Sequence, residues 1–100
     1  MATNYLPGLY APITGTAGVQ QLTSITSTAG STLTVPTGAT VAYVQAQAQP
    51  ILWTWNGTVP SATNGNTIAA GDAFIFIGNL SSVLLLQTTT GSVANVSYYK

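Results

Sequence analysis

The chain has 100 residues, of which only Asp72 and Lys100 carry a charged side chain, and it contains no His, Cys, Glu or Arg. This length is typical of one domain. Acid–base catalysis, nucleophilic catalysis and zinc binding all need residue types that are missing or single here. One lysine cannot supply the phosphate contacts of a nucleic-acid site. We therefore predict that the chain is not an enzyme, has no cofactor or metal, and binds no nucleic acid.

The surface must be made soluble by neutral polar residues, because charged residues are only 2% of the chain against a usual share of about 25%. Such a surface has little self-repulsion and suits a protein that lives in an assembly; a free neutral domain is the alternative. The N-terminal sequence lacks the basic and apolar regions of a secretory signal. No apolar run approaches the ~18 residues that cross a bilayer, so we expect no membrane partner.

Residues 1–18 are predicted to form an extended N-terminal arm. Pro and Gly recur every few residues in this segment, which disfavours regular structure. The arm also carries apolar side chains, which we expect to pack on its own domain or on a neighbouring subunit. They are Tyr5, Leu6, Leu9, Tyr10 and Ile13.

From residue 19 onward, short runs rich in β-branched and aromatic residues alternate with turn signals such as Asn56-Gly57. No window has a sustained helical period. Eight short strands at this spacing predict an all-β domain over residues 19–100, an antiparallel β-sandwich for which a jelly-roll arrangement is left open. The predicted strands are 19–26, 31–35, 40–48, 51–55, 67–69, 73–77, 82–88 and 93–99.

Two predicted strands are apolar on both faces. In the strand 73–77, Phe74 and Phe76 share one face, while Ile75 and Ile77 share the other. The segment 83–86 is apolar throughout. Such a strand is either central in its sheet or covered by a partner, and two of them in so small a domain favour a homo-oligomer.

The remaining chemistry is aromatic and amide. Asp72, the lone carboxylate side chain, follows Ala-Gly, and a turn explains it better than catalysis. Trp53 and Trp55 share one strand face, which favours a place in the core or in a protein interface over a sugar-binding platform. Because neighbouring strand residues alternate, one of Tyr98 and Tyr99 is expected to point inward and the other outward.

One longer pattern extends over about residues 35–99. It consists of WTWNGTVPSAT at 53–63, then Gly65, Ala70-Gly71-Asp72, Gly78 and Ser82, and a closing NVSYY at 95–99. The pattern resembles a group of small virion proteins of tailed bacteriophages. They share a motif like W-x-x-[DN]-G-T-x-P-[TS]-A-[TS]-x-G, then A-G-[DE], and end in V-S-Y-Y. The resemblance implies a capsid decoration or cement subunit, or an accessory part of a tail or fibre.

The chain departs from this pattern in two ways. Trp55 stands where a polar residue is more typical, and the Arg and Asp usually found around the Trp strand are missing. Both differences make Trp55 a better contact candidate than Trp53.

The leading hypothesis is a non-enzymatic subunit of the virion, made in the host cytoplasm, that binds the exterior of a phage capsid and bridges capsid proteins. Its partners are then the major capsid protein or other virion proteins, and symmetric sites on a shell favour a homo-oligomer, first of all a trimer. The alternative is a carbohydrate-binding β-module or accessory subunit of a tail or fibre that uses Trp55 and Tyr99. The predicted contact residues are Tyr5, Leu6, Leu9, Tyr10, Ile13, Trp55 and Tyr99.

Overall fold

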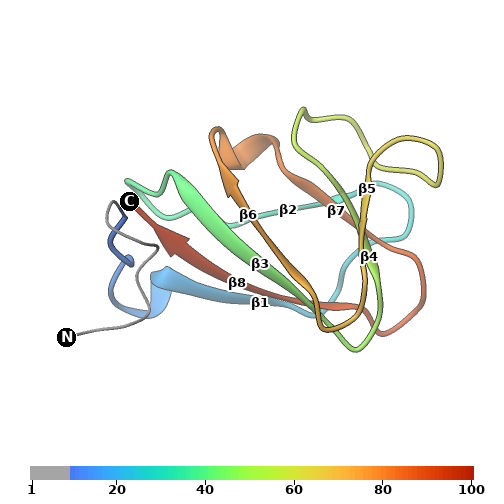
Figure 1. The fold of residues 1–100 in the computed structure, drawn as a ribbon, viewed down its shortest axis with the longest axis horizontal. Helices are drawn as coiled ribbons and strands as arrows, with labels where there is room; N and C mark the ends of the chain where they lie inside the picture. The colour runs from blue at the N-terminus through green and yellow to red at the C-terminus, as the bar shows by residue number, and fades with distance from the viewer. Residues whose placement is uncertain (1–9) are drawn as a thin grey trace.

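The computed structural model describes residues 10–100 and shows an all-β architecture with two short 3-10 helices (Figure 1). Each of the eight predicted strand segments overlaps one observed strand; 73–77 and 93–99 have the predicted bounds, whereas the strand predicted at 67–69 lies one residue earlier, at Asn66–Ile68. The strands are β1 Val19–Leu22, β2 Ser31–Thr32, β3 Val41–Gln47, β4 Ile51–Thr54, β5 Asn66–Ile68, β6 Ala73–Ile77, β7 Leu84–Gln87 and β8 Val93–Tyr99. The 3-10 helices are η1 Thr16–Gly18 and η2 Leu80–Ser82.

The strands form two antiparallel sheets with the orders β1-β8-β3-β6 and β2-β7-β4-β5. The strands pair from the two ends of the chain inward: β1 with β8, β2 with β7, β3 with β6 and β4 with β5. The chain is thus one long hairpin of strand pairs wrapped into two layers, which is the jelly-roll order. The predicted antiparallel β-sandwich is confirmed. The strand order also shows that the jelly-roll arrangement, which the sequence left open, is the one present.

Apolar side chains fill the space between the sheets. On β3, the small residues Ala42, Val44 and Ala46 are fully buried and point inward, while Tyr43 points outward. The predicted strand 40–48 also included Ala48, but the strand ends at Gln47 because Ala48 has a φ of 74°. The buried core cluster is Ile25, Leu33, Ala42, Val44, Ala46, Ile51, Ile68, Leu80, Val83, Leu85, Ala94, Val96 and Tyr98.

The two segments that are apolar on both faces have different positions. Strand β7 is central in its sheet, between β2 and β4, and its outward side chains Leu84 and Leu86 are each only 9% exposed. Strand β6 is at the edge of its sheet, and its outward side chains Ile75 and Ile77 are 47% and 55% exposed. Only for β6 does the second apolar face stay uncovered among residues 10–100.

The predicted arm is described in part. Tyr5, Leu6 and Leu9 lie outside the described residues. From residue 10 on, the chain runs antiparallel to the end of β8, with Ala11 N donating to Lys100 O at 3.1 Å and Ile13 N to Tyr98 O at 3.0 Å. Ile13 also packs against the core. Of the two expected arrangements, packing on its own domain is the one seen for residues 10–13.

An aromatic group closes the side of the sandwich between β4 and β6. The Trp53 ring stacks on Phe74, with ring centroids 3.8 Å apart and an interplanar angle of 8°. Phe76 meets Trp53 edge-on at 6.3 Å. Trp53 belongs to one sheet and the two Phe belong to the other. These contacts therefore join the two sheets at the edge strand β6.

We expect Trp53→Ala to lower the free energy of unfolding by about 3 kcal/mol, since the change removes a large ring from a partly buried stack. Trp55→Ala is the matched control: its ring is 51% exposed, so a loss below about 1 kcal/mol is expected. Denaturant unfolding followed by circular dichroism measures both. Equal losses for the two variants would contradict a role of Trp53 in joining the sheets.

Candidate interaction surface

The outward side of the sheet β1-β8-β3-β6, called the outer face, carries an apolar row. Val19, Ser97, Tyr43 and Ile75 lie side by side across the four strands, because Val19 pairs with Ser97, Ser97 with Tyr43, and Tyr43 with Ile75. Ile77 follows Ile75 on the same face. Val19 is 64% and Tyr43 38% exposed, so this row presents large apolar side chains to solvent on β1, β3 and β6, with the small polar Ser97 between them on β8.

A row of amides runs beside the apolar row. Gln21, Asn95 and Gln45 are cross-strand neighbours, and Gln47 lies two residues beyond Gln45. Gln21 Nε2 donates to Asn95 Oδ1 at 2.9 Å, and Asn95 Nδ2 donates to Gln47 Oε1 at 2.7 Å. These bonds hold the side chains of three strands in fixed positions. The outer face is therefore an ordered surface with an apolar half and an uncharged hydrogen-bonding half.

No charged side chain lies on this face among the described residues. Asp72 is exposed in the turn before β6, where its N donates to Ala69 O at 3.0 Å, and Lys100 follows β8. An extended apolar patch on a small protein is typical of a surface that binds another macromolecule. The chemistry available here is burial of apolar area and exchange of neutral hydrogen bonds.

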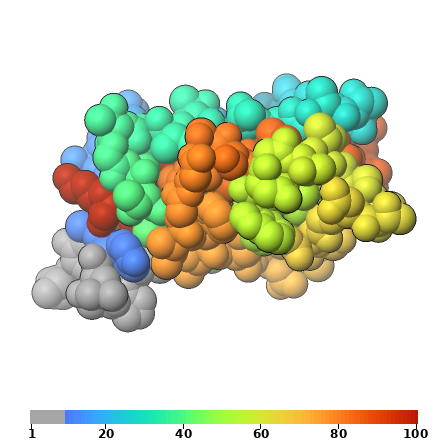
Figure 2. Space-filling model, turned by 90° about the horizontal axis from the view of Figure 1, so that it is seen from above, coloured from blue at the N-terminus to red at the C-terminus, as the bar shows by residue number. Residues whose placement is uncertain are grey.

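Trp55 presents a second exposed aromatic surface. It follows β4, and its ring lies 6.3 Å from Trp53, so it is on the β6 side of the sandwich. The loop after Trp55 is fixed by Asn56 Oδ1, which accepts from Thr58 N at 3.1 Å, and by Gly57 N, which donates to Ser82 O at 2.9 Å. Figure 2 shows this loop (yellow-green) against the orange segment that contains η2. The loop beside Trp55 is thus held in place, while the Trp55 side chain remains 51% exposed.

The other predicted contact residues have less free surface. Tyr10 and Ile13 are half-buried on their own domain. Tyr98 is in the core and Tyr99 is on the opposite face of β8, in agreement with the expected alternation. Tyr99 is nevertheless only 9% exposed, so it does not offer the open ring that the sugar-binding hypothesis needs.

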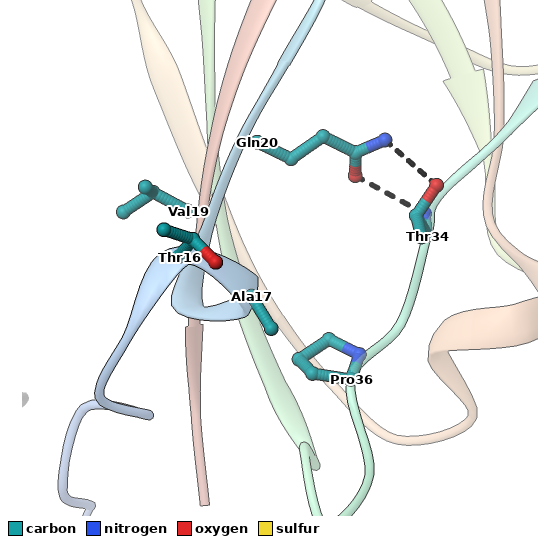
Figure 3. Close-up of a pocket in the computed structure, with 6 residues that line it drawn as sticks. All are labelled: Thr16, Ala17, Val19, Gln20, Thr34 and Pro36. Carbon is teal, nitrogen blue, oxygen red and sulfur yellow. Dashed lines mark hydrogen bonds between the residues drawn. The ribbon is translucent and has the colours of Figure 1, made fainter.

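An open pocket lies at the opposite side of the sandwich from the Trp53 stack, where β1 meets the segment after β2 (Figure 3). The Gln20 and Thr34 side chains that line it are already paired: Gln20 Nε2 donates to Thr34 Oγ1 at 3.0 Å, and Gln20 Oε1 accepts from Thr34 N at 3.1 Å. Tyr98 OH donates to the same oxygen at 2.7 Å. The pocket therefore marks a structural clamp between the sheets. Its lining is Thr16, Ala17, Val19, Gln20, Thr34 and Pro36.

Comparison with known proteins adds no relative, because no family model, curated protein or solved structure matches the chain. Within residues 10–100, no helix is long and apolar enough to cross a membrane.

The apolar row was only partly visible in the sequence. Ile75 and Ile77 were identified as a second apolar face, but Val19 and Tyr43 were not singled out. Val19 is followed by two Gln residues, and Tyr43 lies in a strand whose opposite face forms the core, so only the strand order places both in one row with Ile75. The register of the sheet, which strand patterns do not encode, creates this surface.

Burial raises the pKa of Tyr98 from 10.0 to about 12. The Tyr98 hydroxyl therefore stays protonated to a higher pH in the folded state than in the unfolded state. The stabilisation linked to this group is complete below pH 10 and is lost as the pH rises from 10 to 12, by about 1.4 kcal/mol per pH unit. We expect the free energy of unfolding of the parent chain to fall in that range more steeply than that of Tyr98→Phe, as measured by urea titrations at several pH values. Parallel pH profiles would contradict burial of the Tyr98 hydroxyl in the folded state.

Proposed function

We propose that the chain is a non-enzymatic structural subunit of a phage virion, a decoration or cement protein that binds the capsid exterior and bridges capsid proteins. The apolar row on the uncharged outer face carries this proposal. Such a row costs solubility in a free domain and gains stability when it is covered. The resemblance of residues 35–99 to small virion proteins supports the same class, and jelly rolls are common in capsid proteins as well as in lectins.

The mechanism that follows is burial. A subunit that lays its outer face across two neighbouring capsid proteins removes apolar area from water on both, and each covered apolar side chain favours the closed shell. The amide row supplies hydrogen bonds that fix the orientation without the desolvation of charges. The partner is then the major capsid protein or another virion protein, and a homo-oligomer on the shell, first of all a trimer, fits the symmetry of such sites.

Particles with and without this chain provide the direct test. We expect shells that carry the protein to survive heating or low ionic strength better than shells that lack it, because bridging contacts resist separation of neighbouring capsid proteins. Light scattering and electron microscopy report the surviving fraction. Equal survival of both kinds of particle would contradict a cement function.

The surface used can be tested with a matched pair of charge substitutions. We expect Tyr43→Lys to weaken association with shells at least about tenfold, since it places an unpaired charge at the centre of the outer face. Thr67→Lys, in the exposed part of β5 on the other sheet, should bind like the parent. Cosedimentation with purified shells measures both, and equal binding by the two variants would contradict use of the outer face.

A carbohydrate-binding module of a tail or fibre is the second candidate, and the exposed Trp55 ring favours it. The neighbouring amides argue against it, because Asn56 Oδ1 and Asn79 Oδ1 already accept hydrogen bonds within their own turns, from Thr58 N and from Ser81. A glycan array with the parent chain and Trp55→Ala decides between them. Binding that is lost in Trp55→Ala would support this candidate, and no binding by the parent would end it.

A further inference from the structure

We propose that the edge of β6 that faces away from β3, where no strand pairs among residues 10–100, pairs antiparallel with β6 of a second copy of this chain, about a two-fold axis at Ile75. The proposal deepens the proposed function, because it names one partner of the exposed strand as another copy of the subunit. It is argued from the hydrogen-bond pattern, the side chains and the charges of β6.

The backbone of β6 has a defined outward set of hydrogen-bonding groups. Gly78 N donates to Thr40 O at 3.1 Å, and Ala46 N donates to Asp72 O at 2.9 Å, so the Thr40–Gly78 and Ala46–Asp72 pairs each make one hydrogen bond and occupy hydrogen-bonded positions at the two ends of the β3–β6 ladder. Such pairs alternate along an antiparallel ladder. Phe74 and Phe76 therefore bond to β3, whereas the N–H and C=O groups of three residues point away from it. These residues are Ala73, Ile75 and Ile77.

This outward set is complementary to itself. When two β6 strands pair antiparallel with Ile75 opposite Ile75, Ala73 lies opposite Ile77 of the other copy, and all three pairs are of the hydrogen-bonded type. Every outward N–H and C=O of both strands then has a partner. A shift by two residues in either direction leaves at least one pair unmade, so the two-fold register is favoured over its neighbours.

The side chains suit the same arrangement. On the outer face, Ile75 meets its own copy and Ile77 meets Ala73, which extends the apolar row across both subunits. On the inner side, Phe74 of one copy lies beside Phe76 of the other. Trp55, on the β6 side of the sandwich, lies near the incoming strand with 51% of its surface exposed. The contact therefore explains two exposed apolar features with one partner.

Natural edge strands avoid such pairing with charged residues, Pro or short length. Strand β6 has none of these protections: it is five residues long and contains no charge and no Pro. The other edge strands of the described part are shorter, namely β1 with four residues, β5 with three and β2 with two. Asp72 precedes β6, but in the two-fold register the two Asp72 side chains are about 20 Å apart along the strands and do not repel strongly.

Cysteine substitution tests this contact, because the chain has no cysteine of its own. In the proposed pair, the two Cα atoms of residue 75 are about 5.5 Å apart, within the range of a disulfide. We expect Ile75→Cys to form a disulfide-linked dimer under mild oxidation at least tenfold faster than Val19→Cys. The control residue Val19 is 64% exposed on β1, at the other edge of the same sheet.

The register is tested by mixing Ala73→Cys with Ile77→Cys. We expect the mixture to give the mixed disulfide at least tenfold faster than either variant alone gives its own. Equal cross-linking of Ile75→Cys and Val19→Cys, or no mixed disulfide in the register experiment, would overturn the pairing. Circular dichroism confirms that each variant is folded.

These experiments use the free chain, so they separate this inference from the proposed function. Binding to shells without cross-linking at residue 75 would overturn the strand pairing alone. Cross-linking at residue 75 without any effect of the chain on shell survival would support the pairing and overturn the cement function. The contact has two-fold symmetry and thus differs from the trimer expected first from shell symmetry.

Discussion

A strand at the edge of a two-layer sandwich has one face to bury, and β6 has apolar side chains on both. Its Phe74 and Phe76 enter the sandwich and meet Trp53, while Ile75 and Ile77 remain at the surface. The jelly-roll order enforces this position, because β6 pairs with β3 on one side and the chain then crosses to the other sheet. The exposed apolar row and the proposed contacts all depend on this constraint.

The sandwich has no disulfide, because the chain contains no cysteine, and its two open sides are closed in different ways. On the β6 side, an aromatic stack joins the sheets through apolar contact. On the β1 side, the Gln20 amide accepts from Tyr98 and Thr34 and donates back to Thr34. Because both closures use side chains that point between the sheets, they leave the apolar row of the outer face exposed.

Much of the fold could be predicted from the sequence, because period-two alternation and turn residues such as Asn56-Gly57 are local signals. Strand ends were less predictable: the pattern continued to Ala48, where the backbone adopts a positive φ instead. The jelly-roll order could not be predicted, since it depends on which strands pair over long sequence distances. For that reason the outer face, which needs Val19, Tyr43 and Ile75 in one row, was found only in the structure.

For the predicted contact residues too, the sequence indicates some features and leaves others to the three-dimensional structure. Trp55 was selected because it departs from a family-like pattern, and it is exposed. Tyr99 was selected by alternation, which gives its face but not what covers it, and it is buried. Single-residue exposure depends on neighbours that are distant in sequence, so alternation identifies a face more reliably than a contact site.

Hydrogen exchange of the isolated chain, measured by NMR at increasing protein concentration, tests the central claim about β6 most directly. The amides of Phe74 and Phe76 face β3 and should be protected at every concentration. The amides of Ala73, Ile75 and Ile77 face away from β3, and the account predicts that their protection rises with concentration as a second strand covers them. Rapid, concentration-independent exchange of these three amides would contradict it.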